Sequence, residues 1–152
     1  MKDFINFPIL IIDDELESDT AGGRALREII GELKKRNFSV IEALKGNDGR
    51  LIFLSHPNIS CILIDWYLGL EIDDDYPFPL EIIKDIKKKN GGVPIYLITD
   101  KLTTQKISND VFKEISGYIW KTEDTPSFIA GRIEASALGY LENAYPPFLK
   151  GL

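Results

Sequence analysis

Several short apolar runs in this sequence end in residues that can bind a cation or a phosphoryl group. Carboxylates follow two of the runs, because Asp13 and Asp14 come directly after FPILII and Asp65 ends ISCILID. A hydroxyl and an amine end two others, at Thr99 in VPIYLIT and at Lys121 in GYIWK. Carboxylate oxygens suit Mg²⁺, and positive charge together with hydrogen-bond donors suits phosphoryl oxygens.

These runs have the character of buried parallel strands, which are rich in Val, Ile and Leu and lie between turn signals. Helical apolar spacing alternates with them along the chain. We expect strands at 8–12, 38–44, 59–64, 93–98 and 117–120, and helices at 23–36, 48–54, 79–89, 103–114 and 125–143. The last helix should have Asp124 as its N-cap and Pro126 in its first turn.

This alternation predicts an α/β fold with a five-stranded, parallel, doubly wound sheet of the flavodoxin-like or receiver-like kind, in strand order 2-1-3-4-5. Ligands of such sheets bind beyond the carboxyl ends of the strands. Asp13, Asp14 and Asp65 should therefore flank one crevice, with Thr99 and Lys121 at the same edge. Carboxylates this close should repel each other and raise at least one pKa, and a bound cation would relieve that repulsion.

A single instance of such residues would mean little, because Asp at a strand end often caps a turn and a strand-end Lys is usually solvated. The expected site is also bordered by two long polar connections, at 15–22 and 70–79. The second of these, LEIDDDYPFP, is acidic. Long connections in a compact domain are often functional, and an exposed, solvated insertion is the equal alternative.

Length and charge restrict the class of protein. A chain of 152 residues fits one domain with a sizeable core. The net charge of −6 argues against a nucleic-acid partner. No apolar run approaches the roughly 20 residues that span a bilayer, and no secretory signal is visible, so we expect a cytoplasmic protein without a membrane partner. Cys61 lies within an expected strand, as a buried and inert thiol.

The segments IIDDE (11–15), LIDWYL (63–68), LIT (97–99) and GYIWK (117–121) together resemble the receiver domains of bacterial response regulators. This resemblance implies phosphorylation, with a histidine kinase as a partner. It assigns the following residues: Asp65 as the phosphoacceptor; Asp13, Asp14, Asp65 and the Tyr67 carbonyl as Mg²⁺ ligands; Thr99, Lys121 and the mobile aromatic Tyr118 as switch residues.

The sequence also departs from the receiver pattern. Thr122 follows the lysine where receivers usually have proline, and Asp100 follows Thr99 where a small residue is usual. The acidic loop at 70–79 replaces the expected turn after the phosphoacceptor. These departures weaken the case for an active phosphoreceiver and leave the fold prediction unchanged.

The last third of the chain resembles a different family, the bacterial ornithine/lysine/arginine decarboxylases, at the end of their N-terminal receiver-like "wing" domain. The similar segments are Trp120, EDT (123–125), FIAGR (128–132), Tyr140, PPF (146–148) and, earlier, DTAGGRA (19–25). In helix-packing terms, FIAGR would direct Phe128 and Ile129 toward the sheet, and Gly131 would allow a close approach.

The second resemblance implies a receiver-like domain at 1–143 and, at 144–152, the start of a linker to a following domain. That domain would be the pyridoxal phosphate (PLP)-dependent decarboxylase core, which holds PLP through a lysine further along the parent chain. The wing would then be an assembly or regulatory module, not catalytic by itself, with the parent's other domains and subunits as partners. The retained acids, Thr99 and Lys121 keep the phosphoacceptor hypothesis open, and both can hold for one protein.

Overall fold

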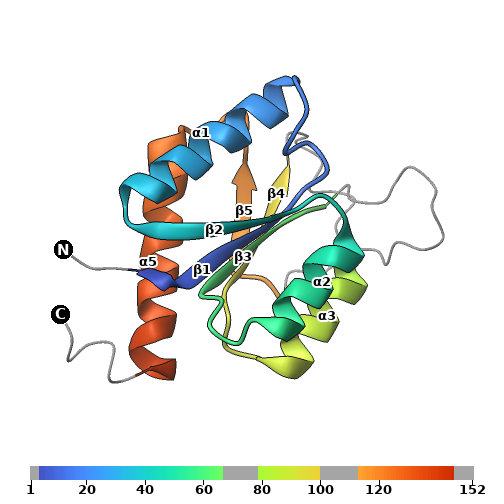
Figure 1. The fold of residues 1–152 in the computed structure, drawn as a ribbon, viewed down its shortest axis with the longest axis vertical. Helices are drawn as coiled ribbons and strands as arrows, with labels where there is room; N and C mark the ends of the chain where they lie inside the picture. Colours follow the sequence, from blue (N-terminus) through green and yellow to red (C-terminus); the bar gives the residue numbers. More distant parts are fainter. Residues whose placement is uncertain (1–3, 67–78, 100–112, 146–152) are drawn as a thin grey trace.

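The computed structural model describes residues 4–66, 79–99 and 113–145. Its elements are β1 (Phe4–Ile12), α1 (Ala21–Lys35), β2 (Phe38–Ala43), α2 (Gly46–Ser55), β3 (Cys61–Asp65), α3 (Pro79–Lys89), β4 (Ile95–Thr99), β5 (Gly117–Trp120) and α5 (Pro126–Ala144) (Figure 1). The helix expected at 103–114 falls almost entirely outside the described residues. Each strand predicted from the sequence is present, with ends that differ by a few residues.

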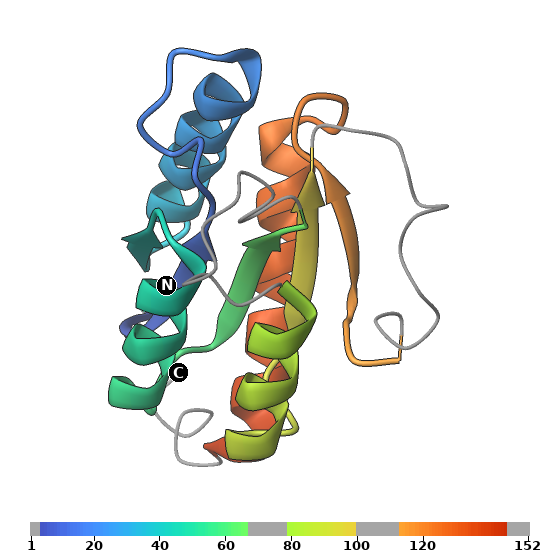
Figure 2. The same ribbon diagram turned by 90° about the vertical axis from the view of Figure 1, so that its right-hand side faces the viewer.

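The strands form a single parallel sheet in the order β2-β1-β3-β4-β5, which confirms the predicted topology. The register pairs Ile12 with Ile64, Ile64 with Leu97, and Thr99 with Trp120. The carboxyl ends of β1, β3, β4 and β5 therefore lie along the same edge, and Figure 2 shows the arrowheads of β3, β4 and β5 pointing to it. This edge is where the reactive residues were expected.

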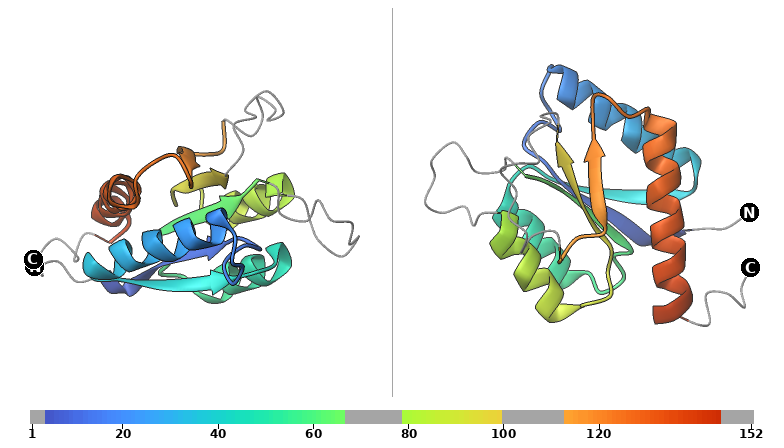
Figure 3. Two further views of the ribbon diagram at one scale, coloured as in Figure 1. Left: turned by 90° about the horizontal axis from the view of Figure 1, so that it is seen from above. Right: turned by 180° about the vertical axis from the view of Figure 1, so that it is seen from behind.

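Helices cover both faces of the sheet and make a three-layer domain. Along β1, Ile9 and Ile11 pack in the core beneath α1 and α5, whereas Leu10 and Ile12 pack beneath α2 and α3. This alternation follows from the two-residue period of a strand, and both faces are apolar because both are covered. Figure 1 and the left view of Figure 3 show α1 and α5 on one side of the sheet and α2 and α3 on the other.

The N-terminus of α5 differs from the prediction by one residue. Thr125 is the N-cap, because its side chain accepts a hydrogen bond from the backbone N–H of Phe128. The Asp124 carboxylate instead accepts from the backbone N–H of Trp120, at 3.2 Å, and closes the turn that precedes the helix. The expectation of Asp124 as N-cap was therefore wrong, while Pro126 lies in the first turn as predicted.

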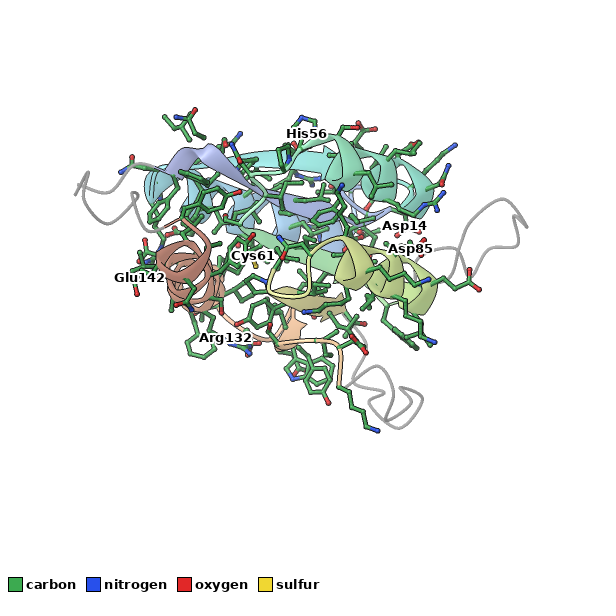
Figure 4. The ribbon with its side chains drawn as sticks, turned by 90° about the horizontal axis from the view of Figure 1, so that it is seen from below. Asp14, His56, Cys61, Asp85, Arg132 and Glu142 are labelled. Atoms are coloured by element: carbon green, nitrogen blue, oxygen red, sulfur yellow. The ribbon has the colours of Figure 1, made fainter. Side chains whose placement is uncertain are left out.

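The FIAGR segment packs differently from the prediction. Ile129 is buried, but Phe128 is 58% exposed, because a helix turns successive side chains by about 100° and only part of its surface faces the sheet. A Cβ on Gly131 would meet only the Arg36 guanidinium, at 4.0 Å, so no close approach requires this glycine. Arg132, labelled in Figure 4, helps to anchor α5, since it donates to the Tyr118 carbonyl at 2.7 Å.

The expectation of a buried, inert thiol holds. Cys61 is fully buried, and burial raises the pKa of its thiol to about 12, so this thiol is inert. Lys87, in the last turn of α3, donates to the carbonyl oxygens of Gly91 and Val93, a favourable place for a cation at a helix C-terminus. Among the helices in the described part of the chain, none combines the length and apolar character needed to cross a bilayer.

Candidate functional site

The predicted site residues meet at the carboxyl edge of the sheet. Asp13 follows β1, Asp65 ends β3, Thr99 ends β4 and Lys121 follows β5. All four are buried, with Asp13 at 0% and Lys121 at 1% exposure, whereas Asp14 is exposed. Charged side chains are almost never this buried unless they are paired, so the arrangement calls for a specific explanation.

The three aspartates lie close enough to share a cation. One carboxylate oxygen from each of Asp13, Asp14 and Asp65 lies within 4.8 Å of the others. Mg²⁺ takes hard oxygen donors, accepts a small number of carboxylates and keeps several waters, so this donor set fits it. The fourth expected ligand, the Tyr67 carbonyl, lies outside the described residues and remains a prediction.

Lys121 is held by two carboxylates. Its Nζ donates to Asp13 Oδ2 at 2.8 Å and lies 2.9 Å from Glu15 Oε1. Its backbone N–H donates to the Thr99 carbonyl at 2.9 Å, which fixes the end of β5 against the end of β4. The ammonium is therefore positioned over the acid cluster by the sheet itself and by two ion pairs.

Burial and pairing act on the pKa values of this group in opposite directions. Burial raises the pKa of Asp13 to about 6, and the ion pair with Lys121 and the Glu15 N–H only partly offset that effect. Burial alone would lower the pKa of Lys121, but the charges of Asp13 and Asp65 and the hydrogen bonds to Asp13 and Glu15 raise it above its ordinary value. One carboxyl pKa is raised as expected, but the cause differs: desolvation contributes most, and the like charge that adds to it is Glu15, not the other aspartates.

Glu15 belongs to the site, although the sequence reasoning gave it no role. Its Oε1 pairs with Lys121, its Oε2 accepts from Thr20 Oγ1 at 2.6 Å, and its backbone N–H donates to Asp13 Oδ1 at 2.9 Å. The carboxylate lies against Gly22, where a Cβ would come within 2.6 Å of Glu15 Oε2. The available signal was the acidic triplet at 13–15 followed by the Gly-Gly pair, which together indicate a tightly packed connection.

Tyr118 lies on β5 beside the site. Its ring stacks on Trp120, with centroids 5.9 Å apart, and its carbonyl oxygen accepts a hydrogen bond from Arg132. Arg132 also lies over the Tyr96 ring, 5.2 Å from the centroid, so this residue of α5 contacts both β4 and β5. The expected switch role of Tyr118 remains a prediction, while Asp100 and the acidic loop at 70–78 lie outside the described residues.

Comparisons with known proteins give two kinds of relative. The biodegradative arginine decarboxylase of Escherichia coli K12 is 27% identical over 146 residues, which cover 95% of this chain and 19% of that enzyme. The structure of lysine decarboxylase A from Pseudomonas aeruginosa has a TM-score of 0.74 at 23% identity, covering 90% of this chain and 19% of the other. A response regulator receiver domain from Clostridium thermocellum has a TM-score of 0.67 at 19% identity, covering 88% of this chain and 95% of the other.

The structural likenesses, both below 25% identity, show the receiver-like fold alone. The chain spans about a fifth of the length of the curated decarboxylases that it matches. The family model described as "Orn/Lys/Arg decarboxylase, N-terminal domain" matches residues 21–140, from the start of α1 into the last turns of α5. Because this match covers most of the sequence, the chain belongs to the family of Orn/Lys/Arg decarboxylase N-terminal domains.

Proposed function

We propose that this domain is a receiver-like assembly and regulatory module of a cytoplasmic, PLP-dependent basic amino-acid decarboxylase and does not decarboxylate by itself. The observation that carries the proposal is the family match over residues 21–140 in a chain that spans a fifth of its relatives' length. We place the domain at 1–143 and the start of the linker at 144–152; α5 continues through Ala144. PLP, which supplies the electron sink for decarboxylation, would be held by a lysine of the parent's core.

An assembly role needs a surface that other domains or subunits can cover. On α2, Leu51 and Leu54 are three residues apart and are 50% and 44% exposed, and Leu44 lies just before the helix with 37% exposure. Residues three apart lie on the same side of a helix, so the two α2 leucines present one apolar strip. This strip is exposed apolar surface of the kind that an assembly role would need.

The test uses the full-length product of the gene and a version that lacks residues 1–143. We expect the full-length protein to release CO₂ from ornithine, lysine or arginine and the isolated domain to release none. Deletion should reduce the number of subunits in the assembly, as obtained from light scattering, while the PLP absorbance persists. A reading frame without a PLP-binding domain, or a deletion that leaves the subunit number and the kinetics unchanged, would contradict the proposal.

The strand-end geometry favours a second function, a phosphoaccepting receiver that regulates the parent. In this role Asp13, Asp14, Asp65 and the Tyr67 carbonyl would hold Mg²⁺, whose charge would stabilise the transferring phosphoryl group. The Asp65 carboxylate would attack the phosphorus of a histidine kinase's phosphohistidine, with the histidine nitrogen as leaving group. Thr99 and Lys121 would donate to the phosphoryl oxygens, and Tyr118 would respond to their movement.

Two measurements test the receiver function. Mg²⁺ should change the fluorescence of Trp66, which is adjacent to Asp65, and acetyl phosphate with Mg²⁺ should add one phosphoryl group to the protein mass. Asp65→Asn should abolish the mass increase. Asp19→Asn, at an exposed position in the connection after β1, should leave it unchanged. A protein whose mass and fluorescence respond to neither reagent is not a receiver.

A further inference from the structure

We infer that Glu15 is a positioning residue that couples Lys121, in the strand-end site, to the first turn of α1. The direction of the coupling rests on the proposed phosphoryl site, because an anion there would draw Lys121 away from Glu15. The coupling itself is a property of the ligand-free protein and can be measured without any ligand.

A series of three contacts, each sharing a residue with the next, connects the site to α1. The Lys121 ammonium lies 2.9 Å from Glu15 Oε1. The second oxygen of the same carboxylate accepts from Thr20 Oγ1 at 2.6 Å. Thr20 is the N-cap of α1, and its Oγ1 accepts from the backbone N–H of Gly23 at 3.1 Å. One carboxylate therefore bridges the buried ammonium and the capping hydroxyl.

The connection that carries Glu15 is packed tightly against α1. A Cβ on Gly23 would come within 2.3 Å of the Ser18 carbonyl oxygen and 2.6 Å of the Glu15 carbonyl oxygen. Arg27, one turn into the helix, donates to the Ser18 carbonyl at 2.9 Å. The connection and the first turns of α1 thus form one packed unit, so a displacement of the Glu15 side chain acts on the helix start.

Burial strengthens the electrostatic attraction between Lys121 and Glu15. The Lys121 side chain is fully buried and the Glu15 side chain is 23% exposed, so water screens their attraction weakly. An anion at the strand ends would compete with Glu15 for the ammonium protons. Loss of Lys121 would leave the Glu15 carboxylate without its cation, and the Thr20 hydroxyl would then lose a fixed partner.

The far end of α1 is joined to α5. At the end of α1, Arg36 donates to Glu134 of α5 at 3.3 Å and to the Ser127 carbonyl at 3.4 Å. The two helices lie side by side on one face of the sheet, as the views in Figures 1 and 3 show. Occupancy of the site would therefore act on α1 and α5 as well as on β4 and β5.

The first test uses no ligand and reads both ends of the contact chain by NMR. Thr20→Val should move the side-chain nitrogen resonance of Lys121, and Thr20→Ser, which keeps the hydroxyl, should restore it. Glu15→Gln should speed hydrogen exchange at the Gly23 amide, by less than the roughly fivefold expected for complete loss of the cap, because Thr20 itself remains. The control Glu17→Gln removes the same charge from an exposed position two residues away and should change neither signal.

An unchanged Lys121 resonance in Thr20→Val, or an unchanged Gly23 exchange rate in Glu15→Gln, overturns the coupling. Both variants retain Asp13 as the buried partner of Lys121, so each is expected to fold. The rescue by Thr20→Ser separates the hydroxyl contact from a general loosening of the connection.

The second test adds Mg²⁺ and beryllofluoride, a phosphoryl mimic, and follows Trp66 fluorescence. Glu15→Gln should bind beryllofluoride several-fold more tightly than the natural sequence or Glu17→Gln, because one of the two carboxylates that hold Lys121 has lost its charge. Equal affinity in all three proteins overturns the inference that Glu15 competes for Lys121. If none binds while the ligand-free coupling is present, the phosphoryl function fails and the coupling is upheld.

Discussion

The two ends of the parallel sheet are fastened in different ways. At the carboxyl end, buried charges meet, with Lys121 paired to Asp13 and Glu15. At the amino end, Asn90 Nδ2 donates to the Tyr140 hydroxyl at 2.6 Å, Ser60 donates to the Phe7 carbonyl at 2.8 Å, and Lys87 donates to backbone carbonyl oxygens of Gly91 and Val93. A neutral contact also joins the Tyr96 hydroxyl to the Ser136 hydroxyl.

A stable fold and a binding site place different demands on the polar contacts of the sheet. Hydrogen bonds hold α3 and α5 at the amino end, and none of the described ones is a buried ion pair like that of Lys121 with Asp13. Buried ion pairs are a poor route to stability, because desolvation offsets much of their attraction. The buried charges at the carboxyl end are therefore better explained by ligand binding than by stability. Removing groups from each end in turn tests this comparison.

The largest effect is expected for Lys121→Met. The substitution leaves Asp13 and Asp65 buried without their cation, and breaking a buried pair in this way costs about 3–5 kcal/mol. Urea unfolding followed by tryptophan fluorescence gives the free energy of unfolding. Lys84→Met, on the exposed face of α3, is the control and should change stability by less than about 0.5 kcal/mol. Equal losses in the two variants would show that the buried ion pair of Lys121 has no special effect on stability.

Gly23→Ala should have the next largest effect. Its new Cβ would meet backbone oxygens of Ser18 and Glu15 that cannot move alone, so we expect a loss of about 1–3 kcal/mol. Gly91→Ala, at the amino end, would place its Cβ 3.7 Å from the Lys87 carbonyl oxygen, an ordinary contact, and should be nearly neutral. Chemical unfolding of both variants gives the free energy of unfolding lost at each position, and the difference measures how tightly the connection at the carboxyl end is packed.

Tyr140→Phe tests the amino end directly. The substitution removes the acceptor of the Asn90 amide and keeps the ring in its packing, so we expect a loss of about 1 kcal/mol. Thermal unfolding of the variant beside the natural sequence gives the value. A loss as large as that of Lys121→Met would show that the amino end depends on its polar contacts as strongly as the carboxyl end does.

The smallest effect, and a favourable one, is expected for Gly139→Ala in α5. A Cβ there meets nothing within 4 Å, and alanine restricts the unfolded chain, so the helix should gain about 0.5–1 kcal/mol. The melting temperature of the isolated domain should rise accordingly. A decrease would show that the surface near the amino end tolerates less than its open space indicates.

Much of the fold could be predicted because its determinants are local in sequence. Apolar runs bounded by turns gave the strands, and their alternation with helices gave the parallel order. The predictions were wrong where the choice between two neighbouring residues depends on tertiary packing. Asp124 and Thr125 are both good capping residues, and only the path of the turn after β5 selects Thr125. Phe128 and Ile129 are both apolar, and only the rotation of α5 against the sheet exposes Phe128.

The sequence by itself determined that Asp13, Asp14, Asp65, Thr99 and Lys121 share one edge, because parallel strands must end together. It did not determine which charges pair there. The ion pair of Lys121 with Glu15, and the link from Glu15 to Thr20, depend on how the connection after β1 folds onto Gly22 and Gly23. Local sequence patterns determine where the strands form. The partners of a buried charge depend on packing between segments that lie more than a hundred residues apart, as for Lys121 and Asp13.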